Sequence, residues 1–281
     1  MNASFGDIAN DGSVGIYTTN ITENGILIQG NNYWQPKSEG AAEHTSFVNL
    51  AKISGIENAG WSYGAQFGDL NNDGFMDLYV ANGFISAKEN TSYWYDYSKV
   101  TGGNSAIIGD AKNWPDMEGK SQSGYTQDKI WLNNSDGLFE DVSDKICPAA
   151  TYDGRAVAIA DLWNRGVLDV VVANQNNIPL VYKNEATNNN HWLAFDLQGT
   201  VSNADAIGAR VEVEWDGKKQ AQIVTGGMGF SSQNQHRLHF GIGKSDKIDQ
   251  VTIYWPSGRT DKIENPGINK LHIIKESKPN N

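Results

Sequence analysis

The sequence predicts an all-β fold. Apolar residues alternate with polar ones or form short runs, such as Leu78-Tyr79-Val80 and Val170-Val171-Val172, rich in β-branched and aromatic residues. Turn-forming residues bound these runs, and the 281 residues include 30 glycines and 9 tryptophans. No segment has the spacing of a long amphipathic helix, or the roughly 18–20 consecutive apolar residues that a membrane span needs. We therefore expect short strands, tight turns and no membrane span.

Charge and cysteine content narrow the possible partners. The chain has 22 basic and 33 acidic side chains, a net charge of −11. A nucleic-acid binder needs a basic surface to follow the phosphates, so this balance argues against one. Cys147 is the only cysteine, which excludes an intrachain disulfide. The sequence thus predicts no nucleic-acid partner.

A repeated phrase organises the first two thirds of the chain. Three segments align: Phe5-Gly-Asp-Ile-Ala-Asn-Asp-Gly-Ser-Val-Gly15, Phe67-Gly-Asp-Leu-Asn-Asn-Asp-Gly-Phe-Met-Asp77 and Ile159-Ala-Asp-Leu-Trp-Asn-Arg-Gly-Val-Leu-Asp169. Phe47 and Phe139 each lie 22 residues before the first aspartate of the second and third segments. Units of about 60 residues with several strands are typical of β-propeller blades. Residues 1–186 thus predict about three blades, with an aromatic insertion at 84–127. Because three blades cannot close a ring, we expect the missing blades from the same, longer chain.

The middle repeat predicts a calcium loop. Oxygen-bearing side chains occupy positions 1, 3, 5 and 9: Asp69, Asn71, Asp73 and Asp77. Gly74 at position 6 permits a sharp turn, and Phe75 at position 7 can add its carbonyl oxygen. Such all-oxygen ligation selects Ca²⁺. An EF-hand would have Glu at position 12, where this chain has Val80, so we expect the loop in a β-hairpin. The alternative is a plain Asn/Asp/Gly turn.

The other two repeats depart from this pattern. The first keeps Asp7 and Asp11 but has Ala9 and Gly15 at positions 3 and 9, so it is a possible calcium site with half the side-chain ligands. The third keeps Asp161 and Asp169 but has Arg165 at position 5. A guanidinium can neutralise carboxylates directly, so we predict an ion-paired loop without metal.

These phrases resemble the FG-GAP (VCBS) repeat of integrin-type propellers, above all Phe67-Gly-Asp-Leu-Asn-Asn-Asp-Gly-Phe-Met-Asp-Leu-Tyr-Val-Ala-Asn82. A second group of phrases resembles the ASPIC/UnbV domain that follows such propellers in the cartilage acidic protein 1 family. Its members are His191-Trp-Leu193, Ser202-Asn-Ala-Asp-Ala-Ile-Gly-Ala209, Gly226-Gly-Met-Gly-Phe-Ser-Ser-Gln233, Leu238-His-Phe-Gly-Ile-Gly243 and Val251-Thr-Ile-Tyr-Trp-Pro-Ser-Gly258. The resemblance implies calcium binding, an extracellular or cell-envelope location, and a role in adhesion or recognition. It implies no agreed biochemical activity.

The C-terminal part predicts a β-sandwich-like domain over 187–276, followed by a tail at 277–281. Six short alternating strands are expected, at 192–197, 210–215, 220–224, 237–240, 250–255 and 270–274. The glycine-rich phrases of this domain predict turns and close packing. The alternative is a small ligand held by polar residues: Ser202, Asn203, Asp205 and Gln233.

The insertion at 84–127 is a candidate ligand-binding segment, because long loops on rigid scaffolds often carry binding sites. Its aromatic residues are Tyr93, Trp94, Tyr95, Tyr97 and Trp114. Aromatic platforms beside carboxylates such as Asp96 and Asp116 suit sugar rings. The alternative is that these rings only fasten the loop to the propeller.

The function predicted from the sequence is a calcium-binding, non-catalytic module for extracellular recognition or adhesion. Its expected ligand is a glycan or an extracellular protein. The alternative is a propeller enzyme that acts on a polysaccharide or a secondary metabolite through the aromatic and acidic insertion.

Overall fold

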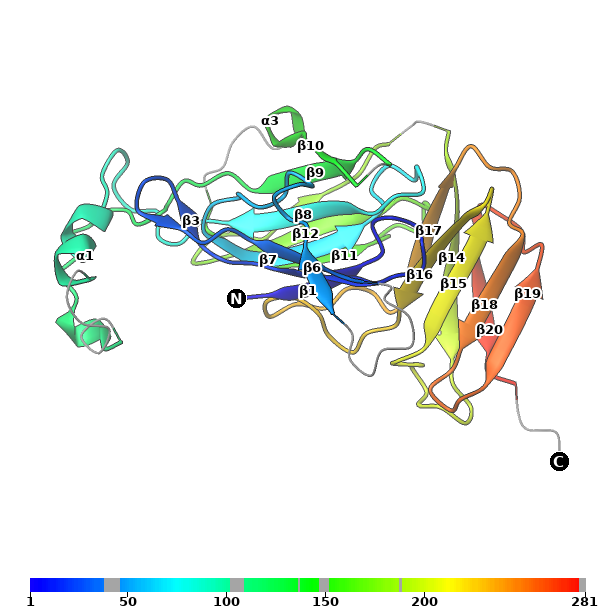
Figure 1. The fold of residues 1–281 in the computed structure, drawn as a ribbon. Helices are drawn as coiled ribbons and strands as arrows, with labels where there is room; N and C mark the ends of the chain where they lie inside the picture. The colour runs from blue at the N-terminus through cyan, green and yellow to red at the C-terminus, as the bar shows by residue number, and fades with distance from the viewer. Residues whose placement is uncertain (38–45, 102–108, 136, 147–151, 187–188, 278–281) are drawn as a thin grey trace.

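The structure is a computed structural model of the chain. It describes residues 1–37, 46–101, 109–135, 137–146, 152–186 and 189–277. Cys147 lies outside these ranges. Its regular secondary structure consists mainly of strands, which confirms the all-β prediction (Figure 1).

Residues 3–182 form three antiparallel sheets, here called the blade array. The first has the order β1 (Ala3–Gly6), β2 (Gly15–Thr18), β5 (Asn32–Pro36), β6 (Phe47–Asn49). The second has the order β7 (Ser62–Gly68), β8 (Asp77–Asn82), β9 (Lys129–Asn133), β10 (Phe139–Asp141). The third has the order β11 (Gly154–Ala160), β12 (Asp169–Asn174), β13 (Leu180–Tyr182). A small hairpin of β3 (Thr22–Glu23) and β4 (Leu27–Ile28) follows β2.

The middle sheet of the blade array is covered on both faces. Along β8, Leu78 and Val80 point into a core shared with the first sheet, whereas Tyr79 and Ala81 point into a core shared with the third. All six residues of β8 are buried, which explains why its sequence is a continuous apolar run instead of an alternating one. The edge strands β1, β7 and β11 pack side by side, as the inner strands of blades do.

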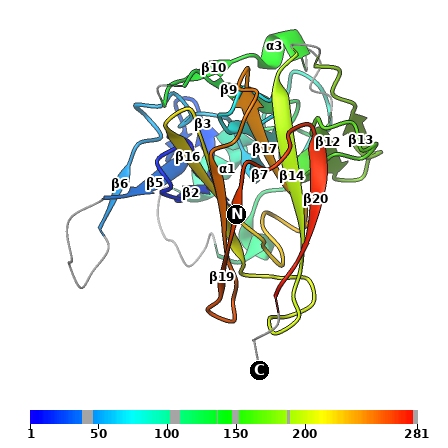
Figure 2. The ribbon, with the colours of Figure 1, turned by 90° about the vertical axis from the view of Figure 1, so that its right-hand side faces the viewer.

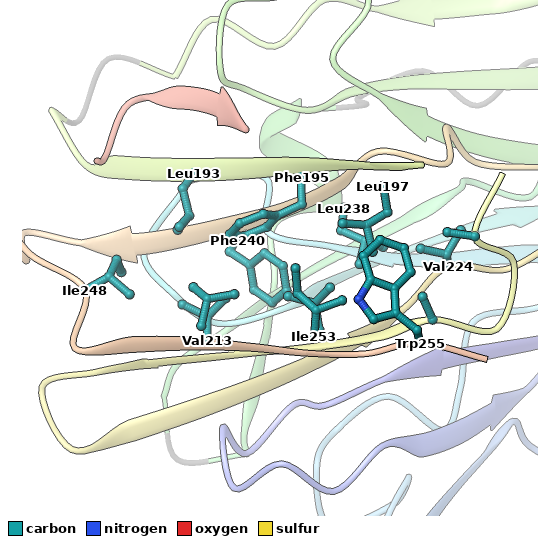
Figure 3. Close-up of a cluster of buried hydrophobic side chains, with 14 of the residues drawn as sticks. Leu193, Phe195, Leu197, Val213, Val224, Leu238, Phe240, Ile248, Ile253 and Trp255 are labelled. Carbon is teal, nitrogen blue, oxygen red and sulfur yellow. The ribbon is translucent and has the colours of Figure 1, made fainter. Parts of the chain in front are cut away.

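Residues 191–275 form a sandwich of two sheets, here called the C-terminal unit. One sheet has the order β17 (Leu238–Gly243), β14 (His191–Gln198), β20 (Lys270–Lys275), with β14 and β20 parallel. The other has the order β16 (Lys218–Ile223), β15 (Arg210–Trp215), β18 (Gln250–Tyr254), β19 (Thr260–Glu264). In the core between them, Leu193 and Phe195 face Val213 and Ile253 from the opposite sheet (Figure 3). β19 was not among the six predicted strands.

The structure thus contains five sheets of three or four strands in a propeller-like arrangement. The prediction of about three blades differs from this in detail. Three of the sheets belong to the blade array, and the other two enclose the separate core of the C-terminal unit.

The insertion adds the main helical feature. It contains α1 (Trp94–Thr101) and the short 3₁₀ helix η1 (Ala111–Asn113), and a further short helix, α3 (Ser143–Ile146), follows β10. α1 lies at one end of the molecule and the C-terminal unit at the other, as Figure 1 and the view from the C-terminal side in Figure 2 show. Within the described ranges, no helix combines the length and apolar character needed to cross a membrane.

Candidate functional site: the three repeat loops and their joint with the C-terminal unit

The three repeat loops are the hairpin connections β1–β2, β7–β8 and β11–β12, here called loop 1 (7–15), loop 2 (69–77) and loop 3 (161–169). In each hairpin the residue before the loop pairs with loop position 9: Gly6 with Gly15, Gly68 with Asp77, and Ala160 with Asp169. The repeat seen in the sequence is therefore also a repeat of backbone register.

Loop 2 is folded around its own aspartates. Asp69 Oδ1 accepts a hydrogen bond from Asp73 N (3.1 Å) and Oδ2 accepts one from Gly74 N (2.8 Å). Asp77 Oδ2 accepts from Leu70 N (2.8 Å), and its Oδ1 accepts from the backbone at the end of β9 (3.0 Å). Gly74 has φ +96°, a left-handed conformation that explains why glycine stands at position 6.

The predicted calcium ligands of loop 2 also include Asn71, Asp73 and Phe75. Asn71 Nδ2 lies 2.9 Å from Asp73 Oδ2, and Asp73 Oδ1 accepts a hydrogen bond from Phe75 N at 2.9 Å. The Lys218 ammonium lies 4.7 Å from the centre of the Phe75 ring. The five residues predicted to bind calcium are thus parts of one compact turn.

The carboxylates of loop 2 are electrostatically strained. Asp69 and Asp77 are 1% and 0% exposed. Burial raises the pKa of Asp69 well above its usual range, and the charge of Asp73 raises it further. Burial and the charge of Asp69 do the same to the pKa of Asp77, and burial also raises the pKa of Asp73. Such shifts mean that the folded loop disfavours three negative charges unless a cation compensates them.

No preformed metal cage exists in the described part of the chain, where no three His, Cys, Asp or Glu side chains are gathered as metal ligands. The donor set of loop 2 also includes an amide and a main-chain carbonyl, as calcium loops do. Each carboxylate oxygen keeps a lone pair beyond the hydrogen bond it accepts from the backbone. The residues therefore fit calcium chemically, with some rotation of the carboxylates.

Loop 1 brings only Asp7 and Asp11 to the corresponding turn. Asp7 is fully buried, and its Oδ2 accepts hydrogen bonds from Gly12 N and Ala221 N, both at 3.0 Å. Asp7 Oδ1 is buried without a partner among the described residues. Burial raises the pKa of Asp7 to about 6, and the charge of Asp11 adds to the shift. Asp11 itself is exposed and accepts from Ser13 N at 2.7 Å.

Loop 3 repeats the backbone hydrogen bonds that loop 2 makes to its aspartates. Asp161 accepts hydrogen bonds from Arg165 N (2.8 Å) and Gly166 N (2.7 Å). Arg165 Nη2 lies 2.5 Å from Asp169 Oδ1, and its Nη1 donates to Asn184 O at 2.7 Å. The structure thus places the guanidinium against Asp169, whereas Asp161 is bonded to backbone amides.

The C-terminal unit sits directly on these loops. Gln220 Nε2 donates to Gly74 O (3.1 Å), and Gly243 N donates to Asn72 O (2.9 Å). The buried His239 ring bonds through Nε2 to Asn72 Oδ1 at 2.7 Å. A methyl group added to Gly241 would overlap Asp69 Oδ2. Loop 2 is therefore a joint between the two halves of the chain as well as a candidate metal site.

The segment between β16 and β17 extends this joint along the blade array. Residues 224–237, here called the bridging loop, include the whole of the glycine-rich phrase 226–233 noted above. Met228 O accepts a hydrogen bond from Gln66 Nε2 of β7 (2.6 Å), and Asn234 Oδ1 accepts from Ile159 N of β11 (2.8 Å). The sequence pattern of this phrase predicted turns or a small ligand, and gave no sign of the contacts of the bridging loop with the inner strands β7 and β11. A Met-Gly-Phe run between two strands carries no periodic signal for such long-range docking.

The four polar residues suggested as a ligand site in this domain do not form a common site. Three of them make hydrogen bonds within the C-terminal unit, and the fourth is exposed. Asn203 bonds twice to the backbone of Ile207, and Asp205 is exposed. Ser202 bonds to Glu276 through both N (2.7 Å) and Oγ (3.0 Å). Gln233 Nε2 lies 2.5 Å from His236 Nε2.

Four of the five insertion aromatics contact one another. Trp94 and Tyr97 meet edge to face at 5.8 Å, Tyr97 and Trp114 at 5.0 Å, and Tyr93 lies 6.0 Å from Tyr97. Trp94 also donates from Nε1 to Ser123 Oγ at 2.9 Å. Tyr95 differs from these, because it is 72% exposed.

Beside this cluster lies a polar hollow of about 470 Å³. Its lining includes Trp94, Tyr125, Glu23, Glu89 and Ser92. Of the five predicted aromatics, Trp94 is the member that lines it. The hollow contains carboxylates, hydroxyls and ring edges, the groups that bind sugars or polar peptide segments.

Asp96 is not available as an acid. Lys99 Nζ and Lys120 Nζ each lie 2.8 Å from one of its oxygens. The hydrogen bond from Lys120, followed by that from Lys99, lowers the pKa of Asp96, so it stays ionised at neutral pH. Asp116 is exposed and accepts from Glu118 N at 2.9 Å.

Comparison with known proteins agrees with this division of the chain. Residues 199–281 match the family model described as ASPIC and UnbV. Cartilage acidic protein 1 of Xenopus tropicalis is 25% identical over 282 residues, which cover 90% of this chain and 41% of that protein. Cartilage acidic protein 1 of Homo sapiens is 29% identical over 135 residues, which cover 46% of this chain and 20% of that protein. The chain therefore spans less than half the length of these relatives, and it combines a propeller-like array with an ASPIC/UnbV domain.

Proposed function

We propose that the chain is a calcium-stabilised, non-catalytic recognition module that works outside the cell or in the cell envelope. The extracellular location and the adhesive role rest on the resemblance to FG-GAP and ASPIC/UnbV proteins. In this proposal the sheets of residues 3–182 act as three consecutive blades, and the C-terminal unit caps their loop ends.

One observation carries the calcium part of the proposal. Loop 2 buries Asp69 and Asp77 and places the charge of Asp73 beside them, and none of the three forms a salt bridge with a described residue. Loop 3, in the same register, has a guanidinium at position 5. A cation at loop 2 would supply the positive charge that Arg165 supplies at loop 3.

Bound calcium would act structurally. Asp69, Asn71, Asp73 and Asp77 would hold it, together with the carbonyl of Phe75, and it would offset the repulsion between their charges. Because Asn72 and Gly74 of the same loop bond to the C-terminal unit, ordering loop 2 also orders the joint. Asp7 of loop 1, with its unpartnered Oδ1, is a second candidate ligand, with Asp11 beside it.

Isothermal titration of the chelator-treated chain with Ca²⁺ tests this proposal. We expect one saturable site in the wild type and in Asp161→Asn, and none in Asp69→Asn. Equal heats in the wild type and Asp69→Asn would refute a site at loop 2. A second event that disappears in Asp7→Asn would place another ion at loop 1.

The recognition part of the proposal assigns the ligand to the hollow beside α1. Glu23 and Glu89 would bind hydroxyl or amide groups there, and Tyr125 offers a ring that is 37% exposed. A glycan array probed with the wild type and with Tyr125→Ala separates binding at this hollow from binding elsewhere. Array binding that survives Tyr125→Ala would move the ligand site away from the hollow.

An enzyme that uses the insertion has less support. Hydrogen bonds from Lys120 and Lys99 lower the pKa of Asp96, and Asp116 is exposed and accepts from Glu118 N, so neither residue lies in the buried, apolar setting of a general acid. Product formation lost in Asp96→Asn or Asp116→Asn would restore this alternative.

A further inference from the structure

A cavity of about 200 Å³ lies where the blade array meets the C-terminal unit. The blade side contributes Phe67, Ile159 and Leu168, and the C-terminal side contributes Ala221, Met228 and Leu238. Protein interiors rarely leave spaces much larger than a water molecule. An engineered apolar cavity of about 150 Å³ binds benzene, so this one has room for a substituted single ring.

The lining of this cavity is mainly apolar, and most of its polar groups already have partners. Gln222 Nε2 donates to His239 O (2.6 Å), Asn234 bonds to β7 and β11, and Arg237 Nη1 donates to Asn164 Oδ1 (2.8 Å). Burial lowers the pKa of His239 to about 4, so its ring is neutral at pH 7. No aspartate or glutamate is among the described residues that line the cavity.

Gln235 differs from these polar lining residues because its side-chain amide has a donor without a partner among the described residues. Its Oε1 accepts a hydrogen bond from Asp161 N at 3.2 Å, which fixes the orientation of the amide, because the reverse orientation would set two donors against each other. Its Nε2 is buried and has no partner among the described residues. A buried donor without an acceptor costs free energy, and a water molecule normally needs two to four polar partners to settle in such a place.

We propose that this cavity binds a small, mainly apolar molecule that carries one hydrogen-bond acceptor, for which Gln235 Nε2 is the donor. Phe5 lines the cavity and is 40% exposed, so it lies where the cavity opens to solvent. Because both halves of the chain form the walls, the bound molecule stabilises the joint between them. This site is separate from the hollow beside α1.

A matched pair of probes tests the proposal. Acetophenone and isopropylbenzene have the same heavy-atom connectivity, but only acetophenone has an acceptor. Ligand-observed NMR titration of the wild-type chain should show saturable binding of both. Gln235→Met should weaken acetophenone binding relative to isopropylbenzene binding by about three- to tenfold, the factor that one neutral hydrogen bond contributes. This comparison isolates the hydrogen bond, because the hydration of each free probe is the same in both titrations. A ratio of the two affinities that is unchanged in Gln235→Met would overturn the role of Gln235.

Filling the cavity tests its location. Ala221→Leu and Val14→Phe each place extra carbons in the lining and should abolish binding of both probes, whereas Ala3→Leu, at an exposed residue outside the lining, should not. Two positions are used because one of them can disturb folding, which far-UV circular dichroism would show. Failure of the wild type to bind either probe, or binding that persists in a folded filled variant, would overturn the site.

Discussion

Loops 2 and 3 share one backbone frame and balance their charges differently. In both, the aspartate at position 1 accepts hydrogen bonds from the amides of positions 5 and 6, and the aspartate at position 9 accepts one from position 2. The residue at position 5 is Asp73 in loop 2 and Arg165 in loop 3. One loop thus collects three carboxylates, and the other closes with an internal ion pair.

This difference shows that the frame does not itself require a metal. Loop 3 neutralises Asp169 with the guanidinium of Arg165, whereas in loop 2 the charge of Lys218 acts on Asp73 without a salt bridge. The pKa of Asp69 and of Asp77 is raised by burial and mutual repulsion, which is the cost loop 2 carries without a cation. The residue at position 5 thus determines whether the charges of this frame are balanced within the loop.

Removal of the guanidinium of loop 3 should lower the free energy of unfolding more than any other change that we predict. Asp169 is fully buried, so Arg165→Met leaves a charge without its partner, which typically costs 3–5 kcal/mol. Because the Arg165 side chain is 28% exposed, we expect a loss near the lower end, about 3 kcal/mol, in urea unfolding. Lys183→Met is the matched control, since its pair with Glu185 is exposed and should contribute little to the free energy of unfolding. Similar losses in the two variants would contradict an important pair in loop 3.

Calcium should stabilise the wild type by slightly less than the loss expected for Arg165→Met. At a hundredfold excess over the dissociation constant, one site adds about 2.7 kcal/mol to the unfolding free energy. For a chain of this size this corresponds to a rise in melting temperature of roughly 5–10 °C. Scanning calorimetry with calcium and with chelator measures the difference. Asp69→Asn should remove it and Asp161→Asn should retain it, and a shift of the same size in both variants would place the ion elsewhere.

Replacing the residue at position 5 of loop 2 by that of loop 3 tests whether this one residue decides which loop responds to calcium. Asp73→Arg gives loop 2 the arrangement of loop 3, with the new guanidinium able to reach Asp77. We expect the calcium response to vanish and the chelated protein to gain about 1 kcal/mol, because a repelling charge becomes an attracting one. Urea unfolding with and without calcium measures both effects. A variant that still responds to calcium would show that Asp69, Asn71 and Asp77 suffice.

Part of this architecture could be predicted from the sequence. The repeat was visible in the sequence because the turn needs an aspartate at position 1, which accepts backbone hydrogen bonds, and a glycine at position 6. Gly74 does have the left-handed φ that the pattern predicts. The centre of β8 was also predictable, since residues 78–81 of this strand, which is buried on both faces, form a continuous apolar run. β19 was missed because Thr260-Asp-Lys-Ile-Glu264 contains one strongly apolar residue, and its pairing with β18 decides its structure.

The joint could not be predicted. Gly241 is a glycine because Asp69 of a distant loop occupies the space of a side chain, and no local pattern records such a contact. The aromatic insertion illustrates the same limit. The sequence indicated which residues are aromatic, but only the packing shows that Tyr97 touches three other rings while Tyr95 faces solvent.

The last prediction concerns another buried carboxylate, Glu276, which sharpens the comparison because backbone amides and hydroxyl groups, not a guanidinium, compensate its charge. Glu276 is 2% exposed and accepts hydrogen bonds from the amides of Thr200, Val201 and Ser202 and from the hydroxyl of Ser257. Although burial alone would raise its pKa, these hydrogen bonds lower it to about 2.

A folded-state pKa below the unfolded value stabilises the protein at neutral pH, and this contribution is lost as pH falls from about 4.5 toward about 2. The loop 2 carboxylates have raised values, so without calcium their contribution changes in the opposite direction and improves on acidification. We therefore expect Glu276→Gln to destabilise the chain at pH 7 and the difference from wild type to shrink by pH 3, in urea unfolding at fixed calcium. Glu264→Gln, at an exposed strand end, should show no such trend. A constant difference across this range would mean that Glu276 acts through packing and not through its charge.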